Sequence, residues 1–360
     1  MAQALRLAER GLYTTQPNPR VGCVIAQGDR AVGEGWHRQA GGPHAEIIAL
    51  REAGERARGA TAYVTLEPCG LHGRTPPCAD ALIAAGVARV VIASEDAFQR
   101  AGGALDRLHA AGIGVESGLM RAAARELNRG FFSRVERGRP WLRMKLAMSL
   151  DGRTALANGE SKWITGAAAR ADVQRWRARS SAILTGIGTV LADDPALTVR
   201  LDPLAPDATD GEGFVAPLRV VLDRDLRTPK VARILDASAP TLVLHAGVAT
   251  PPIDAGFRHA EFSEVESGPH GLDLMPVLRL LAARGINEVQ VEAGATLCGA
   301  LFAAGLVDEL LLYVAPVLLG DSARPLLQLP ALSDMAARWK LEVVDRRQVG
   351  DDLRLLLRPA

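Results

Sequence analysis

Short apolar runs alternate with segments of helical periodicity along most of the chain. Apolar runs bounded by turn residues predict buried strands, whereas apolar residues three or four positions apart predict amphipathic helices. The first part of the chain therefore has predicted strands at 21–25, 32–37, 62–66 and 87–93, the first two as a hairpin, and predicted helices at 2–12, 45–57, 79–85 and 104–111. Strand and helix alternate from residue 60 onwards, which is typical of a layered α/β domain.

A charged segment, 134–140, closes on Gly138 and Pro140 and interrupts this pattern. The alternation then restarts, with strands predicted at 141–149, 182–185, 218–222, 241–245, 289–292 and 306–315 and helices at 167–179 and 274–283. A polar stretch rich in Pro, Gly and Asp, 202–213, predicts a surface insertion. We therefore expect two α/β domains, residues 1–138 and 139–360.

Length and composition agree with this division and exclude several functions. A chain of 360 residues is longer than one hydrophobic core usually holds. Forty-two basic against forty-one acidic side chains give a net charge of +1, which argues against a nucleic-acid footprint. Four cysteines are too few for a disulfide scaffold. With no signal-peptide core and no run long enough to span a membrane, we expect a soluble, cytoplasmic protein without membrane or nucleic-acid partners.

One histidine and two cysteines fall where predicted elements meet. His44 precedes the helix at 45–57, Cys69 follows the strand at 62–66, and Cys78 begins the next helix. One imidazole and two thiolates suit zinc and leave its fourth tetrahedral position for water, whose pKa the metal lowers towards neutrality. Glu46 can then carry protons between that water and a leaving amine. Zinc deaminases have this His-x-Glu and Cys signature, although eight residues separate Cys69 from Cys78 here and two do in the general signature.

Two other interpretations of these residues remain open. Any one of them alone is more often a packing residue, because free cysteine behaves as a small buried hydrophobe. A closed structural zinc site is the second alternative, with His72 as its fourth ligand. The combination in this order favours a catalytic site.

Two glycine turns in the second part suggest a nucleotide site. Gly186-Ile-Gly188-Thr189 follows a predicted strand, as phosphate-binding turns do, but Leu191 stands where a full fingerprint has its third glycine. A plain turn is the more common explanation of this loop taken alone. The stretch 293–300 is a second strand-to-helix turn of this kind, and two such turns at strand ends are a typical nucleotide position in an open α/β sheet.

Several motifs together resemble one family, the bifunctional deaminase–reductases of riboflavin biosynthesis. They are Pro17-Asn18-Pro19-x-Val21-Gly22, His44-Ala45-Glu46, Glu67-Pro68-Cys69, Gly73-Arg74-Thr75-Pro76-Pro77-Cys78, Ser149-Leu150-Asp151-Gly152 and Leu191-Ala192-Asp193-Asp194-Pro195. The resemblance covers essentially the whole chain. It implies a cytidine-deaminase-like three-layer αβα domain followed by a dihydrofolate-reductase-like α/β domain. It also implies one zinc ion per chain, NADPH, and a homo-oligomer, either a dimer or a tetramer.

The family's activity would be two successive steps. The first is hydrolytic deamination of 2,5-diamino-6-(5-phosphoribosylamino)pyrimidin-4(3H)-one, and the second is NADPH-dependent reduction of the ribosyl group of the product to ribityl. The resemblance assigns zinc to His44, Cys69 and Cys78 and the proton shuttle to Glu46. The implied NADPH contacts are Ala147, Trp163, Thr189, Asp193, Gly294, Ala295, Thr296, Leu297, Cys298, Gly299 and Ala300. The implied substrate contacts are Asn18, Ser161, Arg177, Leu197, Arg200 and Glu292.

Three stretches of the deaminase half depart from the family pattern. The chain starts inside its first predicted helix, Gly70-Leu71 replace a common Ser-His, and Asp96-Ala97-Phe98-Gln99 replace Asp-Pro-Asn-Pro. One alternative is therefore a working reductase with an inactive, zinc-stabilised deaminase domain, although a structural zinc would not need Glu46. A deaminase acting on nucleic acid is a third hypothesis. The near-neutral charge and the 4% aromatic content count against it.

Overall fold

The computed structural model describes residues 1–70, 77–97, 103–200, 213–247, 255–268 and 271–360. Its contacts divide the chain into two compact units, with a boundary between Gly138 and Arg139, and the described residues 213–215 group with the first unit. His72, Phe98 and Gln99, with nearly all of the predicted insertion at 202–213, lie outside the described residues. None of the described helices is long and apolar enough to cross a membrane.

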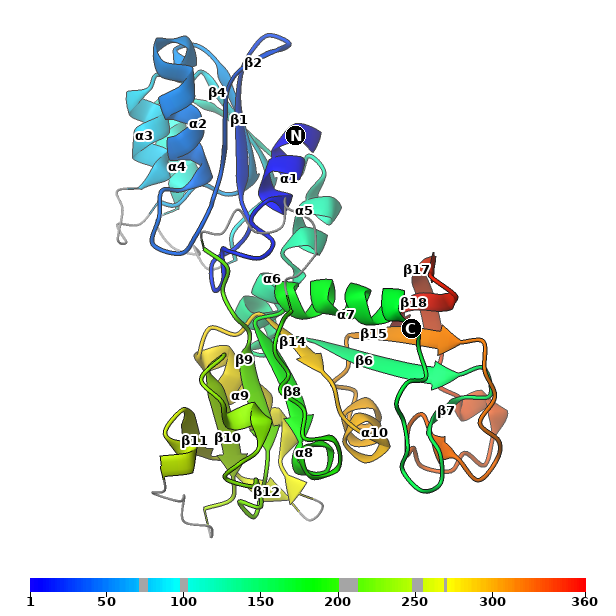
Figure 1. The fold of residues 1–360 in the computed structure, drawn as a ribbon. Helices are drawn as coiled ribbons and strands as arrows, with labels where there is room; N and C mark the ends of the chain where they lie inside the picture. The colour runs from blue at the N-terminus through cyan, green and yellow to red at the C-terminus, as the bar shows by residue number, and fades with distance from the viewer. Residues whose placement is uncertain (71–76, 98–102, 201–212, 248–254, 269–270) are drawn as a thin grey trace. The chain divides into compact units, whose positions relative to one another are not determined.

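The first unit is built on a five-stranded sheet in the order β2-β1-β3-β4-β5 (Figure 1). Strands β1 (Gly22–Gln27), β2 (Arg30–Trp36) and β3 (Thr61–Leu66) are antiparallel neighbours around β1, whereas β4 (Arg89–Ser94) and β5 (Gly114–Ser117) extend the sheet in parallel. The predicted hairpin at 21–37 is therefore confirmed. Its tight turn falls between Gln27 and Arg30, where Gly28 adopts a φ of 58°.

Helices cover both faces of this sheet and make three layers. Alanine-rich faces of α2 (Ala45–Ala53), α3 (Cys78–Ala84) and α4 (Ala104–Ala110) pack in one core with Ile25 and Ile92. On the other face α1 (Ala2–Glu9) and α5 (Arg121–Leu127) pack around Ala93. The predicted three-layer αβα arrangement is present. The helix expected at 45–57 ends at Ala53 as an α-helix and continues as a 3₁₀ turn over Gly54–Ala57.

The second unit contains a nine-stranded sheet in the order β11-β10-β9-β8-β14-β6-β15-β18-β17. The first seven strands in this order, as far as β15, are parallel to one another. Along the chain they are β6 (Trp141–Ser149), β8 (Ala182–Gly186), β9 (Leu218–Leu222), β10 (Thr241–His245), β11 (Ala260–Glu264), β14 (Glu288–Val291) and β15 (Glu309–Ala315). A C-terminal antiparallel pair, β17 (Leu341–Val349) and β18 (Asp352–Pro359), completes one edge. The sequence analysis did not predict this pair.

Helices also cover both faces of the larger sheet. Val277 and Leu281 of α9 (Leu274–Ala283) and Leu301 of α10 (Ala295–Ala303) pack on the main core. Trp176 of α7 (Ala167–Arg179) packs on the opposite face against Tyr313. The short helix α8 (Ile187–Asp193) follows β8 directly. Helix α6 (Arg129–Arg137) extends into the charged segment at the predicted domain boundary, and Phe131 and Phe132 bury one of its sides.

Candidate active sites

The three predicted zinc ligands come from three element ends in the first unit. His44 is the residue before α2 and has extended backbone angles, Cys69 follows β3, and Cys78 is the first residue of α3. Strand β2 approaches α2 so closely that a Cβ on Gly35 would lie 2.2 Å from the Ala45 carbonyl oxygen. This glycine therefore allows the first turn of α2, with His44 before it, to sit against the sheet.

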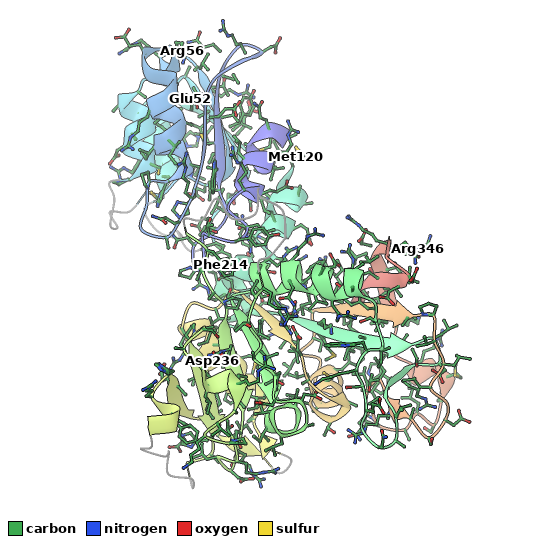
Figure 2. The ribbon with its side chains drawn as sticks, viewed as in Figure 1. Glu52, Arg56, Met120, Phe214, Asp236 and Arg346 are labelled. Atoms are coloured by element: carbon green, nitrogen blue, oxygen red, sulfur yellow. The ribbon has the colours of Figure 1, made fainter. Side chains whose placement is uncertain are left out.

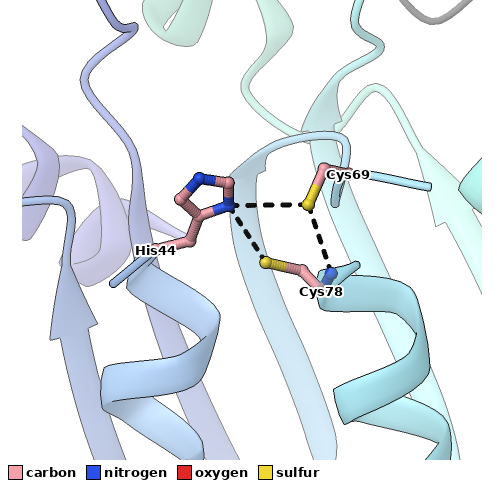
Figure 3. A group of neighbouring side chains, drawn as sticks. All are labelled: His44, Cys69 and Cys78. Carbon is pink, nitrogen blue, oxygen red and sulfur yellow. Dashed lines mark hydrogen bonds between the residues drawn. The ribbon is translucent and has the colours of Figure 1, made fainter. Parts of the chain in front are cut away.

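The ligand atoms of these residues converge on one point (Figure 3). His44 Nδ1 lies 3.2 Å from Cys78 Sγ and 3.5 Å from Cys69 Sγ, and all three ligand atoms are within 4.8 Å of one another. Tetrahedral zinc with bonds of about 2.0–2.3 Å places its ligands about 3.6 Å apart. The arrangement therefore fits zinc with three protein ligands and one open position. The Cys78 N–H also donates to Cys69 Sγ at 3.2 Å, which orients that sulfur.

The pKa shifts at this site favour a bound cation at the two cysteines and proton transfer by Glu46. A hydrogen bond from the Cys78 thiol lowers the pKa of Cys69 to about 4, and the same interaction raises the pKa of Cys78. A metal cation bound here would take the place of the proton between the two sulfurs. Burial raises the pKa of Glu46 to about 7, close to the pH at which a general acid–base works best. Only 3% of Glu46 is exposed, so its carboxyl group is shielded from bulk solvent.

Asn18 is connected to the same site through a histidine that the sequence analysis did not single out. Asn18 Nδ2 lies 3.0 Å from His37 Nε2, and the His37 ring meets the His44 ring edge to face at a centroid distance of 5.4 Å. The predicted pyrimidine contact therefore lies next to the predicted metal site.

A cleft of about 1580 Å³ opens in the second unit, outside the carboxyl ends of its parallel strands. The two glycine turns follow β8 and β14, which are parallel neighbours, so Gly186–Gly188 and Gly294 line it together. Fourteen predicted residues line this cleft, namely Ala147, Ser161, Trp163, Arg177, Thr189, Asp193, Leu197, Arg200, Glu292, Gly294, Ala295, Thr296, Leu297 and Ala300.

Two of the predicted NADPH contacts do not line the cleft. Cys298 is fully buried in the core, with its thiol 3.3 Å from the Ala293 carbonyl oxygen. A Cβ on Gly299 would lie 2.0 Å from the Gln328 carbonyl oxygen. Both residues lie on packed sides of α10, where they set the position of the helix against its neighbours.

Arg177 and Glu292 form a paired group in the cleft. The Arg177 guanidinium donates through Nε and Nη2 to the two carboxylate oxygens, at 2.6 and 2.7 Å, and through Nη1 to the Thr198 carbonyl at 2.9 Å. Burial would raise the pKa of Glu292, but Arg177 and Lys145 outweigh it and hold this pKa at about 2. The carboxylate is therefore ionised at neutral pH.

The sequence analysis missed Lys145, which lines the cleft beside this pair. Burial lowers its pKa, Glu292 opposes that shift, and Arg177 adds to it. A lysine is unusual in a strand as buried as β6, and the alternation of that strand places it on the same face as Ala147. That pattern was the signal that could have identified it.

Comparison with known proteins identifies the domain family of each unit. The family model for the "cytidine and deoxycytidylate deaminase zinc-binding region" matches residues 1–94, and the model for the "RibD C-terminal domain" matches residues 140–355. The riboflavin biosynthesis protein RibD of Escherichia coli is 50% identical over 361 residues, which cover 99% of this chain and 98% of that protein. The RibD of Haemophilus influenzae is 48% identical, over 100% of this chain and 96% of that protein.

Solved structures show the same likeness over the whole chain. Acinetobacter baumannii RibD superposes with a TM-score of 0.90 at 46% identity, covering 100% of this chain and 97% of that one. A Thermotoga maritima diaminohydroxyphosphoribosylaminopyrimidine deaminase/5-amino-6-(5-phosphoribosylamino)uracil reductase superposes with a TM-score of 0.86 at 33% identity, over 100% and 97% of the two chains.

Fold, sites and relatives define an enzyme with a zinc-dependent deaminase domain and an NADPH-dependent reductase domain. The chain belongs to the RibD family, whose members are bifunctional enzymes of riboflavin biosynthesis. The bifunctional interpretation is supported over the reductase-only alternative, because both domains match and the three zinc ligands converge.

Proposed function

We propose that residues 1–138 deaminate 2,5-diamino-6-(5-phosphoribosylamino)pyrimidin-4(3H)-one, and that residues 139–360 reduce the ribosyl group of the product to ribityl. The observation that carries this proposal is the convergence of the three zinc ligands beside Glu46. The same chain has the cleft of the second unit, which Lys145 and Glu292 line. The name of the Thermotoga maritima relative states the same pair of activities for that protein.

In the deaminase site, His44, Cys69 and Cys78 would hold zinc, which supplies the Lewis acidity that makes water reactive near neutral pH. Glu46 would take a proton from the attacking water and deliver one to the leaving amine, and its pKa of about 7 suits both steps. Asn18 would contact the pyrimidine ring. The convergence of the three ligand atoms and the burial of Glu46 support the roles of these four residues.

In the reductase cleft, the two glycine turns and the exposed ring of Trp163 would hold NADPH, the source of hydride. Arg170 lies over that ring, 4.6 Å from its centroid, and supports its orientation. Ionised Glu292 would accept hydrogen bonds from the ribosyl hydroxyls. Lys145 would donate the proton that accompanies the hydride, and Ser161, Leu197 and Arg200 would enclose the substrate.

Product analysis by mass spectrometry tests the order of these steps. Zinc-loaded protein given the diaminopyrimidine without NADPH should form only the deaminated compound. Addition of NADPH should then increase the product mass by two hydrogens. Reduction of supplied deaminated intermediate, without any deamination, would instead favour the reductase-only alternative.

We also propose that the enzyme acts in the cytoplasm as a homo-oligomer. Reduced metal-binding thiols fit that compartment. Exposed apolar side chains recur along the stretch from Leu332 to Val344, including Met335 at 74% and Val343 at 62% exposure, and contact with a second copy of the chain would bury them. Arg346 on β17 lies beside it and is also exposed (Figure 2). Sedimentation of wild-type protein and of Val343→Glu would test this surface, and a monomeric wild type would contradict it.

A further inference from the structure

Two hydrogen bonds connect Asn18, His37 and Pro43 in the deaminase site. His37 Nδ1 lies 3.1 Å from the Pro43 carbonyl oxygen, and His37 Nε2 lies 3.0 Å from Asn18 Nδ2. Only 3% of His37 is exposed. The histidine is therefore held at both ring nitrogens, between the loop that carries Asn18 and the residue that precedes His44.

The chemistry of these partners fixes the histidine tautomer. A carbonyl oxygen only accepts, so His37 Nδ1 must carry the proton that it donates to Pro43. A neutral imidazole has one such proton, which leaves Nε2 as an acceptor. The two hydrogen-bond partners of the buried ring, a carbonyl and an amide, carry no negative charge that would compensate a cationic imidazole, so the neutral form is favoured.

The fixed tautomer in turn orients the Asn18 amide. Only its NH₂ group can donate to His37 Nε2, so its carbonyl oxygen must point the other way. Among the residues that the structure describes, that oxygen has no hydrogen-bond donor, and Asn18 is only partly buried. It is left to accept a hydrogen bond from a ligand.

We propose that His37 is a positioning residue, which fixes the Asn18 amide so that its carbonyl oxygen selects the edge of the pyrimidine that carries N–H donors. This inference rests on the proposed contact between Asn18 and the substrate, and it names the part of the substrate that is recognised. The diaminopyrimidine has amino and ring N–H groups that can donate. A ring that offers only acceptors at this edge would leave the Asn18 oxygen without a partner.

A double-mutant cycle on the full-length zinc-loaded enzyme tests the proposal. Asn18→Ala and His37→Leu should each raise KM for deamination about tenfold, the usual effect of one lost buried hydrogen bond, with a smaller change in kcat. Together they should cost little more than either alone, because His37 acts through Asn18. His37→Gln, whose side-chain oxygen can accept from the Asn18 amide, should recover part of the loss.

Two internal controls separate positioning from structural damage. Zinc content and the reductase activity of the same chain should stay at wild-type levels in every variant. Additive effects of the two substitutions, or loss of zinc in proportion to lost activity, would overturn the positioning role. An Asn18→Ala enzyme with unchanged deamination would instead refute the proposed substrate contact on which the inference rests.

Discussion

Arg177 binds Glu292 through two parallel hydrogen bonds, from Nε to one carboxylate oxygen and from Nη2 to the other. Both side chains are largely buried, and Gln290 Nε2 donates to the same carboxylate at 2.8 Å. A bidentate pair of this kind fixes the plane of the carboxylate as well as its charge. The pair therefore presents Glu292 to the cleft in one orientation.

Loss of one of the two Arg177–Glu292 hydrogen bonds should lower the reductase activity more than the stability of the fold. Arg177→Lys keeps a positive charge but cannot bind both carboxylate oxygens in one plane. We expect kcat/KM for the reductase to fall roughly 10- to 100-fold, as is typical when a reacting group is misplaced. NADPH oxidation with the deaminated substrate measures this effect.

The deaminase activity of the same Arg177→Lys protein is the control, and it should be unchanged. Arg177→Ala is a less informative variant, because an unpaired buried carboxylate costs about 3–5 kcal/mol of stability. A full reductase rate in Arg177→Lys would show that the orientation of Glu292 does not limit the reaction.

Removal of the Glu46 carboxylate should abolish only the first activity. Glu46→Gln keeps the size of the side chain but cannot exchange a proton, so deamination should fall about 10²- to 10⁴-fold. Zinc content should persist, since Glu46 is not one of the three converging ligands. Deamination assays with metal analysis check both expectations.

Cys69→Ser provides the matched comparison, because it removes a ligand atom and should lower zinc content together with deamination. Reduction of supplied intermediate should continue in both variants. Parallel loss of the two activities in Glu46→Gln would contradict independent sites.

The reductase kcat should fall at alkaline pH because Lys145 loses its proton. If its ammonium donates a proton, kcat must fall as pH rises through its pKa, which burial places below the ordinary 10.5. Glu292 raises the pKa of Lys145, so Glu292→Gln should move this fall in kcat to lower pH. NADPH oxidation measured from neutral to alkaline pH follows the shift. Lys145→Met should be nearly inactive at every pH, and an unshifted fall in Glu292→Gln would exclude Lys145 as its source.

Sequence reasoning located the deaminase site well because its residues lie in short motifs at element ends. His44 precedes a predicted helix, Cys69 follows a predicted strand and Cys78 begins the next helix, and the zinc-deaminase signature groups the three as ligands. His37 was missed because its role depends on a hydrogen bond to Asn18, nineteen positions away in the sequence. Hydrophobic periodicity does not report such a contact.

Strand β17 was missed because its apolar residues show no regular pattern of burial. Most of β17 is exposed, and Glu342, Asp345 and Arg347 interrupt its apolar residues, so no alternation marks it as a strand. Its pairing with β18 comes from tertiary structure, which propensity does not predict. Lys145 was missed for a different reason: the strand around it was predicted, but its charged neighbours, Glu292 after β14 and Arg177 of α7, are distant in the sequence.

A buried charge cluster should make a measurable contribution to the stability of the second unit. Arg143 is fully buried, donates to Glu309 at 2.7 Å and to Glu288 at 3.0 Å, and lies 4.6 Å from the centroid of the Trp176 ring. Arg143→Met would leave two buried carboxylates with less positive charge around them, so we expect a loss of about 3–5 kcal/mol in the free energy of unfolding. Arg284→Met, which breaks the more exposed pair with Glu261 in the same unit, should cost less than about 1 kcal/mol. Urea denaturation is the suitable measurement, since guanidinium is itself a salt and would screen the exposed pair much more than the buried one. Equal losses in the two variants would contradict this expectation. They would mean that the cost of removing the charged groups from water offsets the attraction between Arg143 and the two carboxylates inside the protein.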